Sequence, residues 1–303
     1  MTFKHFFLAI ATTVLVAGPA SAQELNGTFK KVKDSGIITM GHREASIGFS
    51  YTEGSNKPMG YSIDICNRII DEMKKELKMS SIEIKYQNVT SANRIPLVVN
   101  GTVDIECGTT TNNATRQKDV AFVVTTYVEE VRIAVKANSG IKSIPDLNGK
   151  TIATTTGTTS VQTLRKNKRA TGVEFKEIFG KDHSDSFLLL ESGRADAFVM
   201  DGSILAGNIA TSKNPADFKL VGEPLSVEPI AIMIRKDDPL LKRLADDTVK
   251  GMIKSGEMTK LWTKWFLSPI PPKDAKVGLA LSAGTKAAWD KPNDKPAEDY
   301  AQK

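Results

Sequence analysis

Short apolar runs alternate along the chain with longer segments in which apolar residues recur every three or four positions. The short runs predict strands, and they cover residues 37–41, 82–86, 103–107, 131–135, 151–154, 197–200 and 230–234. The periodic segments predict helices, and they cover residues 65–77, 91–100 and 240–266, the last with a break near Ser255 and Gly256. This order of elements predicts an α/β protein with mainly parallel sheets covered by helices.

Residues 1–22 have the pattern of a secretory signal peptide. Lys4 supplies a positive start, residues 6–18 form an apolar run, and Ala20-Ser21-Ala22 is a small-residue cleavage site. A transmembrane helix needs about 20 apolar residues, so this run is too short to span a bilayer comfortably. We therefore expect cleavage after Ala22 and a soluble periplasmic protein.

Composition and charge narrow the function further. The 303 residues are 40% hydrophobic and 25% charged, which is ordinary for a globular protein, and the length suggests two lobes, each with its own core. The net charge of +6 is spread along the chain without a concentrated basic run. This pattern argues against nucleic-acid binding and is compatible with an anionic small ligand.

The chain has two cysteines, Cys66 and Cys107. In an oxidising compartment an even pair is a disulfide candidate. The alternative is two buried free thiols that behave as small apolar residues. Sequence alone does not decide between the two.

Motifs diagnostic of common enzyme classes are absent from the sequence, including the phosphate-binding, dinucleotide-binding, zinc-protease and serine-hydrolase patterns. The two histidines of the mature chain, His42 and His183, are too few and too far apart to suggest a metal cluster. We therefore expect neither a cofactor nor a bound metal.

Polar side chains gather where predicted strands give way to helices. In open α/β sheets small ligands bind at the carboxyl ends of strands, and helix N-termini there present N–H groups to anions. The residues at these junctions are Arg43, Ser91, Arg94, Thr109, Thr111, Arg116, Thr159 and Asp201. Each also has an ordinary interpretation as a surface ion pair, helix residue or cap.

The arginines suggest which ligand these junctions bind. A guanidinium group matches a carboxylate with two parallel hydrogen bonds, and a lone aspartate among such donors suits an ammonium group. One arginine and Asp201 would suffice for a neutral amino acid. Arg43, Arg94 and Arg116 together predict a second carboxylate, and therefore an amino acid of net charge −1.

The chain resembles the periplasmic solute-binding proteins of polar amino-acid ABC importers, especially members that bind glutamate and aspartate. The resemblance covers essentially the whole mature chain. It is carried by GHREASIGFSY, GYSIDIC, TSANRIPLVVNGTVDIECGTTTNNATRQK, TGTTS, KDHSDSFLLLESGRADAFVMD and GEMTKLWTKWFLSPIPP, which lie in this order at 41–51, 60–66, 90–118, 156–160, 181–201 and 256–272.

The resemblance implies a type II periplasmic-binding-protein fold, with two α/β lobes joined by two hinge strands around a ligand cleft. Lobe 1 would comprise residues 23–128 and 230–303, and lobe 2 residues 129–229. The protein would be a monomer that carries L-glutamate or L-aspartate to the permease subunits of an ABC importer at the inner membrane.

The resemblance also implies a role for each site residue. Arg116, Thr111 and Thr159 would bind the α-carboxylate, while Asp201 and the main chain of Thr109 would bind the α-ammonium. The side-chain carboxylate would be bound by a second set, consisting of Arg43, Ser91, Arg94 and His183. Similar proteins often have serine where this chain has Thr109, and the added methyl group bears on the preference between aspartate and glutamate.

Two other functions are compatible with the same fold. A dehydratase-like enzyme would need a general acid or base in the cleft, for which Glu106 and His183 are the candidates. A sensory subunit would bind the same ligand but signal through a receptor. We expect a binding protein and not an enzyme.

Overall fold

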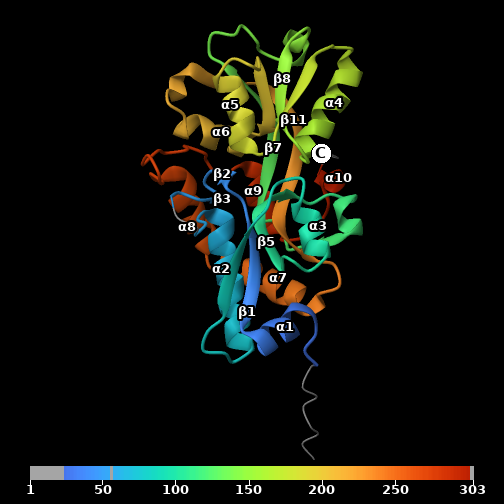
Figure 1. Cartoon of the computed structure of the whole chain (residues 1–303), viewed down its shortest axis with the longest axis vertical. Coiled ribbons are helices and arrows are strands. Elements are labelled where there is room, and N and C mark those ends of the chain that lie inside the picture. Colours follow the sequence, from blue (N-terminus) through green and yellow to red (C-terminus); the bar gives the residue numbers. More distant parts are fainter. Residues whose placement is uncertain (1–23, 55–56, 301–303) are drawn as a thin grey trace, which may run out of the picture.

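The computed structural model describes residues 24–54 and 57–300. The expected signal peptide and its cleavage site lie outside these residues. Within them, none of the helices combines the length and the apolar character needed to cross a bilayer. The elements form two halves, one above the other in Figure 1, with two long strands running between them.

The first half is built on a parallel sheet. Its strands β4 (Glu83–Asn88), β1 (Ile37–His42) and β5 (Ile105–Thr111) lie side by side in this order. The helices and small strands of this half are α1 (Gly27–Ser35), α2 (Tyr61–Glu76), α3 (Arg94–Val99), α7 (Pro239–Lys254), α8 (Glu257–Trp262), β2 (Ala45–Ser46), β3 (Ser50–Tyr51) and β6 (Val120–Phe122). Gly256, at φ 76°, separates α7 from α8 and confirms the predicted break.

The second half repeats this architecture. Its sheet contains β10 (Ala197–Asp201), β8 (Thr151–Thr155) and β9 (Lys176–Gly180) in parallel. Its helices are α4 (Thr159–Thr171), α5 (His183–Glu191) and α6 (Gly202–Thr211). The strand residues Val131, Ile133 and Val199 are buried in an apolar cluster that belongs to this half alone, whereas the largest apolar cluster combines residues of both halves.

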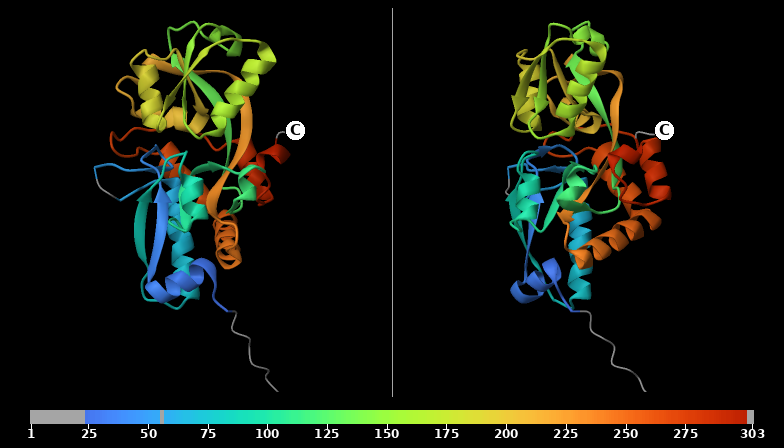
Figure 2. Two further views of the ribbon diagram at one scale, coloured as in Figure 1. Left: turned by 45° about the vertical axis from the view of Figure 1, so that its right-hand side comes forward. Right: turned by 90° about the vertical axis from the view of Figure 1, so that its right-hand side faces the viewer.

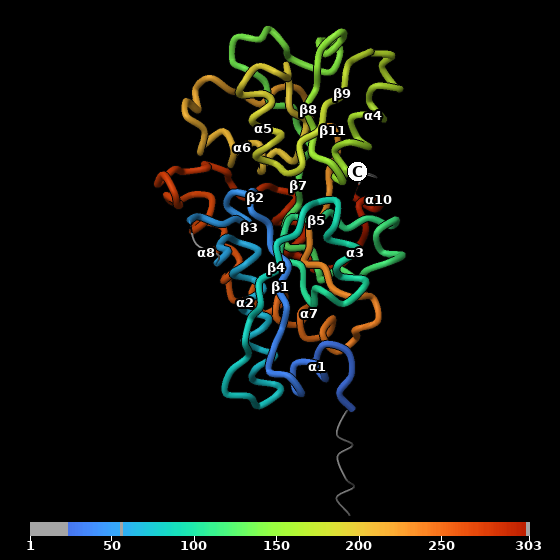
Figure 3. The backbone as a smooth tube through the Cα atoms, viewed as in Figure 1, coloured from blue at the N-terminus to red at the C-terminus, as the bar shows by residue number. Residues whose placement is uncertain are grey.

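Two antiparallel strands cross between the halves, β7 (Tyr127–Lys136) and β11 (Phe218–Arg235). The first part of β11 pairs with β7 in the second half, and Ile230–Ile234 then pairs with β5 in the first half. Hydrogen bonding therefore runs through one sheet with the order β4-β1-β5-β11-β7-β10-β8-β9. The tube in Figure 3 follows both crossings.

Two expectations about the strands are wrong in part. The sheets are mixed, because β11 is antiparallel to β5 and β10 is antiparallel to β7. The strand expected at 103–107 instead runs from Ile105 to Thr111, so the threonines lie within it and not after it. Threonine is β-branched and suits a strand, and pairing with β11 buries these positions.

The first residues of β7 are anchored by an aromatic cluster. The ring of Tyr127 stacks on Phe49 at a centroid distance of 4.7 Å, and Trp262 lies 4.4 Å from Phe266. The hydroxyl group of Tyr61 donates to the carbonyl of Thr126 at 3.0 Å. Such aromatic pairs add about 0.5–1.5 kcal/mol each beyond area burial, which fixes where the crossing strand leaves the first half.

The C-terminal segment also packs against the start of β7. Its helices α9 (Ala283–Asp290) and α10 (Ala297–Tyr300) lie beside the crossing strands in both views of Figure 2. Trp289 Nε1 donates to the carbonyl of Thr126 at 2.9 Å, and the N–H of Val128 donates to Thr285 Oγ1 at 3.0 Å. The polar C-terminus therefore contributes buried contacts as well as surface.

The two cysteines form a disulfide, which settles the alternative left open by the sequence. Cys66 on α2 is bonded to Cys107 on β5, with Cα atoms 6.2 Å apart. Both residues are fully buried. The bridge ties α2, a 16-residue helix of the first half, to the strand that carries the threonine-rich segment.

Candidate functional site

The residues predicted to bind a ligand are all buried, none of them more than 9% exposed. They come from separate segments of both halves. From the first half come Arg43, Ser91, Arg94, Thr109, Thr111 and Arg116, and from the second half Thr159, His183 and Asp201. Their burial argues against the alternative interpretation of several of them as ordinary surface residues.

Arg43 follows β1 and reaches across to the second half. Its Nη2 lies 3.4 Å from Nε2 of His183, the first residue of α5, while its Nη1 has no partner among the described residues. A side chain at Gly108 would occupy this space, since a Cβ there would lie 3.1 Å from Arg43 Cγ and 2.2 Å from Glu106 Oε1. The glycine therefore lets the arginine lie against β5.

The contacts of His183 define its protonation. A guanidinium can only donate, so Nε2 accepts from Arg43, and Nδ1 then carries the proton and donates to Thr155 Oγ1 at 3.1 Å. Burial, followed by the charges of Arg43 and Arg94, holds the pKa of His183 well below its usual value. The neutral ring orients Arg43 in this arrangement.

Arg94 begins α3, which starts later than the predicted helix at 91–100. Thr90 and Asn93 hydrogen-bond each other's backbone N–H groups through their side chains and form a turn in front of the helix. Arg94 Nη1 donates to the carbonyl of Thr109 at 3.3 Å. Within the described chain, Arg94 Nε and Ser91 Oγ are buried without a partner.

Arg116 lies in the short 3₁₀ turn η1 (Arg116–Lys118). Its Nη1 donates to the carbonyl of Thr111 at 2.8 Å, and its Nη2 reaches the carbonyl of Gly157 in the second half at 3.5 Å. This arginine therefore spans the boundary between the halves.

The three arginines lie close enough to disfavour one another's charge. Burial first, and the charge of Arg94 second, lower the pKa of Arg43 to about 10 and that of Arg116 to about 9. Burial also lowers the pKa of Arg94. The site therefore holds three buried cationic side chains, and the carboxylates of Glu106, Asp201 and Glu228 lie close enough to act on the pKa values of Arg94 and Arg116 in the opposite direction.

Asp201 ends β10 and faces the same cluster. Its Oδ1 has no hydrogen-bond partner in the part of the chain that the structure describes. Burial, then the charges of Glu129 and Glu228, raise its pKa well above the usual value, while Arg94 and Arg116 act in the opposite direction. A cationic group beside this carboxylate would restore its charged form.

Two buried glutamates of the crossing strands were not predicted as site residues. Glu129 on β7 and Glu228 on β11 are directly paired in the strand register. Glu129 accepts hydrogen bonds from the backbone N–H and the hydroxyl of Ser203. Their only sequence signal is an acidic residue near the apolar ends of the crossing segments, and the pairing that places them together cannot be derived from one sequence.

Glu228 determines the direction in which the hydroxyl groups of Thr111 and Thr159 donate. Its Oε2 accepts hydrogen bonds from Thr111 Oγ1 and Thr159 Oγ1, each at 2.7 Å. Each hydroxyl has one proton. The hydroxyls of Thr111 and Thr159 therefore donate to Glu228, and toward any other partner they can act only as acceptors.

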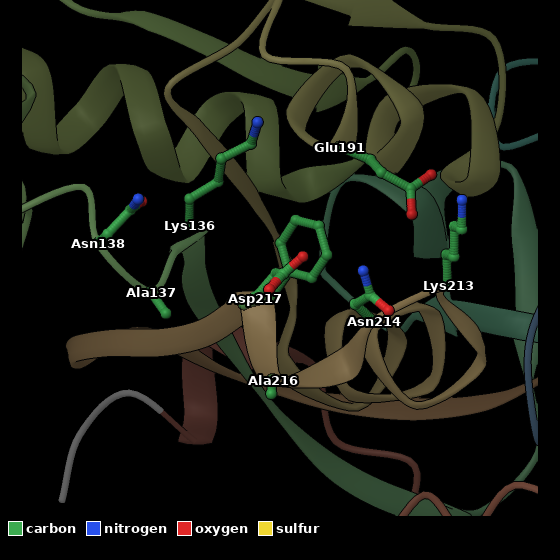
Figure 4. Close-up of a pocket in the computed structure, with 9 residues that line it drawn as sticks. Lys136, Ala137, Asn138, Glu191, Lys213, Asn214, Ala216 and Asp217 are labelled. Atoms are coloured by element: carbon green, nitrogen blue, oxygen red, sulfur yellow. The ribbon is translucent and has the colours of Figure 1, made fainter.

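A groove of about 640 Å³ opens between the halves beside this cluster. Ser91 and Arg116 line it from one side, and Thr159 from the other. A second concavity of about 520 Å³ lies in the half that contains β8 (Figure 4), lined by Lys136, Ala137, Asn138, Glu191, Lys213, Asn214, Ala216, Asp217 and Phe218. It contains none of the residues predicted to bind the ligand. The groove is lined by three of them, Ser91, Arg116 and Thr159, so the candidate site is the buried cluster that the groove borders.

The buried polar atoms without partners define what the site can bind. Among the described residues they include donors on Arg43 and Arg94, the hydroxyls of Ser91 and Thr109, and one oxygen of Asp201. Buried polar groups are rarely left unpaired in proteins. Glu106 Oε1 is also among these atoms, so the site offers several donors for anions and two acidic acceptors. In the described residues, no group of three or more potential ligands is placed to bind a metal ion.

Comparison with known proteins gives the family. The chain is 45% identical over 286 residues to an L-glutamate/L-aspartate-binding protein of Pseudomonas aeruginosa, covering 94% of both chains. It is 43% identical over 299 residues to a glutamate/aspartate import solute-binding protein of Salmonella typhimurium, covering 97% of this chain and 99% of the relative.

A solved structure matches the fold. The ancestral amino acid-binding protein AncCDT-1, a precursor of cyclohexadienyl dehydratase, is 27% identical with a TM-score of 0.68, and the match covers 79% of this chain and 99% of that one. The predicted fold, two α/β lobes joined by two hinge strands, is confirmed. Residues 38–268 match the family model, and the chain belongs to the bacterial extracellular solute-binding proteins, family 3.

Proposed function

We propose that this protein binds an acidic L-amino acid, glutamate or aspartate, at the buried cluster between its lobes and delivers it to the permease of an ABC importer. The observation that carries this proposal is the cluster formed by Arg43, Arg94 and Arg116. Burying three cations together is unfavourable unless anions pair with them. An amino acid with two carboxylates supplies two anions and, through its ammonium group, a partner for Asp201.

The names of the two relatives support the same ligand class, since both bind or import glutamate and aspartate. We propose that Arg116, together with backbone N–H groups at the start of α4, binds the α-carboxylate. Helix N-termini favour anions. The hydroxyls of Thr111 and Thr159 point their protons at Glu228, so their part in carboxylate binding is not donation by the side chain.

The ammonium group would lie between Asp201 and the carbonyl of Thr109. The side-chain carboxylate would be bound by Arg43 and Arg94, with the hydroxyl of Ser91 as a third donor. In this arrangement His183 orients Arg43, because its Nε2 accepts from that guanidinium. Glutamine would leave these arginines without their anion, which costs on the order of 1–3 kcal/mol or more.

Closure of the lobes removes the ligand from water. We propose lobe boundaries at 23–128 and 230–303 for lobe 1 and 129–229 for lobe 2, so that β7 and β11 form the hinge. After cleavage at Ala22 the protein would act as a periplasmic monomer. The closed, liganded form would then be the one that docks on the permease.

We propose binding without catalysis. The structural neighbour described as a precursor of a dehydratase shows why the question arises. A dehydratase-like activity would use Glu106 or His183 as an acid or base. The proton on Nδ1 of His183 is directed at Thr155, while Nε2 faces Arg43. Incubation with candidate substrates and product analysis tests this point directly.

Calorimetric titration with a panel of amino acids tests the proposal. The panel contains glutamate, aspartate, glutamine, asparagine and arginine, added to the mature protein. We expect glutamate or aspartate to bind at least about 100-fold more tightly than the corresponding amide, because an unmatched buried charge costs several kcal/mol. Equal affinity for glutamate and glutamine, or preference for arginine, would contradict it.

A further inference from the structure

Glu228 connects the two lobes through a single carboxylate oxygen. Thr111 belongs to β5 in the first half, and Thr159 is the first residue of α4 in the second half. Both hydroxyls lie 2.7 Å from Glu228 Oε2, and they lie 3.2 Å from each other. These contacts require both halves to be in place.

The carboxylate itself is held firmly. Glu228 is 4% exposed, and its second oxygen, Oε1, accepts a hydrogen bond from Ser226 Oγ at 2.9 Å. It projects from β11, one of the two strands that cross between the halves. Because its two oxygens together bind side chains from both halves, this residue is well placed to favour the approach of the two lobes.

The same contacts determine the direction of the hydroxyl protons. If Glu228 Oε2 accepts from both threonines, neither hydroxyl has a proton left for another partner. Their remaining lone pairs accept hydrogen bonds. If the side chain of Glu228 were absent, each threonine hydroxyl could rotate and donate its proton to an anion instead.

We propose that Glu228 is a positioning residue that holds Thr111 and Thr159 together across the closed cleft and takes both hydroxyl protons, so that these hydroxyls meet the ligand as acceptors. Acceptors suit the ammonium end of an amino acid and repel a second carboxylate. Glu228 therefore sets the orientation of the ligand from the hinge without touching it. This inference rests on the proposed function.

Substitution of Glu228 tests the inference by calorimetry with glutamate. Glu228→Ala removes the acceptor, and we expect glutamate to bind about tenfold to 100-fold more weakly, as expected for two lost hydrogen bonds. In Glu228→Gln the amide oxygen still accepts from both threonines and the amide nitrogen can donate to Ser226, so the loss should stay below about tenfold. Glu223→Ala, an exposed glutamate of the same strand, is the control and should bind as wild type.

A double-mutant cycle with Thr159→Val separates positioning from a general structural role. If Glu228 acts through Thr159, Glu228→Ala should cost markedly less affinity in the Thr159→Val background than in wild type. The inference is overturned if the two effects multiply independently, or if Glu228→Gln is as impaired as Glu228→Ala. Circular dichroism melting identifies any variant that fails to fold.

The cycle also distinguishes this inference from the proposed function. Wild-type protein that does not bind glutamate contradicts the function. Coupling between Glu228 and Thr159 is then measured from urea unfolding of the same four proteins, because the hydrogen bond is present in the structure. Favourable coupling supports the link between the lobes, and absence of coupling overturns it.

Discussion

At the scale of single residues, the site is defined by groups whose charge is disfavoured by their surroundings. Burial lowers the pKa of Arg116 to about 9, and raises that of Asp201 well above its usual value. These shifts are opposite in sign for the cationic and the acidic groups, as desolvation requires. Each would be reduced by a ligand group of the opposite charge. This is the arrangement we expect if these residues recognise a zwitterion that carries an extra anion, as proposed.

Glu129 allows a prediction about pH. Burial raises its pKa from the ordinary 4.5 to about 7. Between these values the folded protein holds a proton that the unfolded chain has released, so the free energy of unfolding falls as pH rises. We predict that wild type loses stability relative to Glu129→Gln between about pH 5 and pH 7, and that the difference is constant above that range. Urea unfolding at a series of pH values measures it.

The control for this prediction is the next residue of the same strand. Glu130 is exposed, and Glu130→Gln should follow the pH dependence of wild type. A stability difference between wild type and Glu129→Gln that does not change between pH 5 and pH 8 would show that Glu129 is ionised throughout.

At the scale of elements, the disulfide between α2 and β5 closes a loop of 41 residues in sequence separation. Constraining a loop of this size in the unfolded chain stabilises the fold by about 2–4 kcal/mol. We predict that the double variant Cys66→Ser and Cys107→Ser loses this amount in urea unfolding but still binds glutamate, since neither cysteine contributes an atom to the site. Unchanged stability of the double variant would show that the bridge is not formed in solution.

The sequence predicted most elements because local patterns determine them. The strands β1, β4 and β10 and the helix α2 were all recognised from hydrophobic periodicity. Errors arose where tertiary pairing decides. β11 is 18 residues long because it pairs first with β7 and then with β5, whereas the hydrophobic pattern alone predicted a strand only at residues 230–234.

The same limit applies to the candidate site. Arg43, Arg94 and Asp201 were found because they follow strands or begin helices, where ligands bind in α/β folds. Glu129 and Glu228 were missed because they lie side by side only through the register of two strands distant in sequence. The direction of the threonine hydroxyls follows from that pairing as well. The local sequence pattern was enough to predict the arginines. The buried glutamates could be recognised only once the pairing of the two crossing strands was known.

At the scale of the whole molecule, the two halves are in contact around the groove. Gly157, before α4, has φ 81°, and a Cβ there would lie 2.7 Å from the backbone of Ala92 in the first half. Arg116 reaches the carbonyl of the same glycine. Only glycine allows this close approach, so the position reports directly on lobe closure.

We predict that Gly157→Ala hinders closure and weakens glutamate binding by at least about tenfold, because a methyl group would meet backbone atoms that cannot move aside. Small-angle X-ray scattering should show a more open form at a glutamate concentration that closes wild type. Gly172→Ala is the matched control. It has φ 68° and therefore similar backbone strain, but a Cβ there would meet nothing within 4 Å.

The control should lose stability, because a left-handed conformation costs an alanine roughly 1–2 kcal/mol, and it should still bind and close. Gly157→Ala that closes and binds as well as Gly172→Ala would mean that the contact between Gly157 and Ala92 is not part of the closed state in solution.

The measurement that tests the central claim most directly is the ratio of glutamate to glutamine affinity in Arg94→Ala, determined by calorimetry beside Arg194→Ala, an exposed arginine of the second half. Truncating one member of a buried charge pair costs about 2–5 kcal/mol. We predict a loss of at least about 30-fold for glutamate and less than about tenfold for glutamine in Arg94→Ala, with Arg194→Ala unchanged for both. Equal losses for the two ligands would contradict the assignment of Arg94 to the second carboxylate.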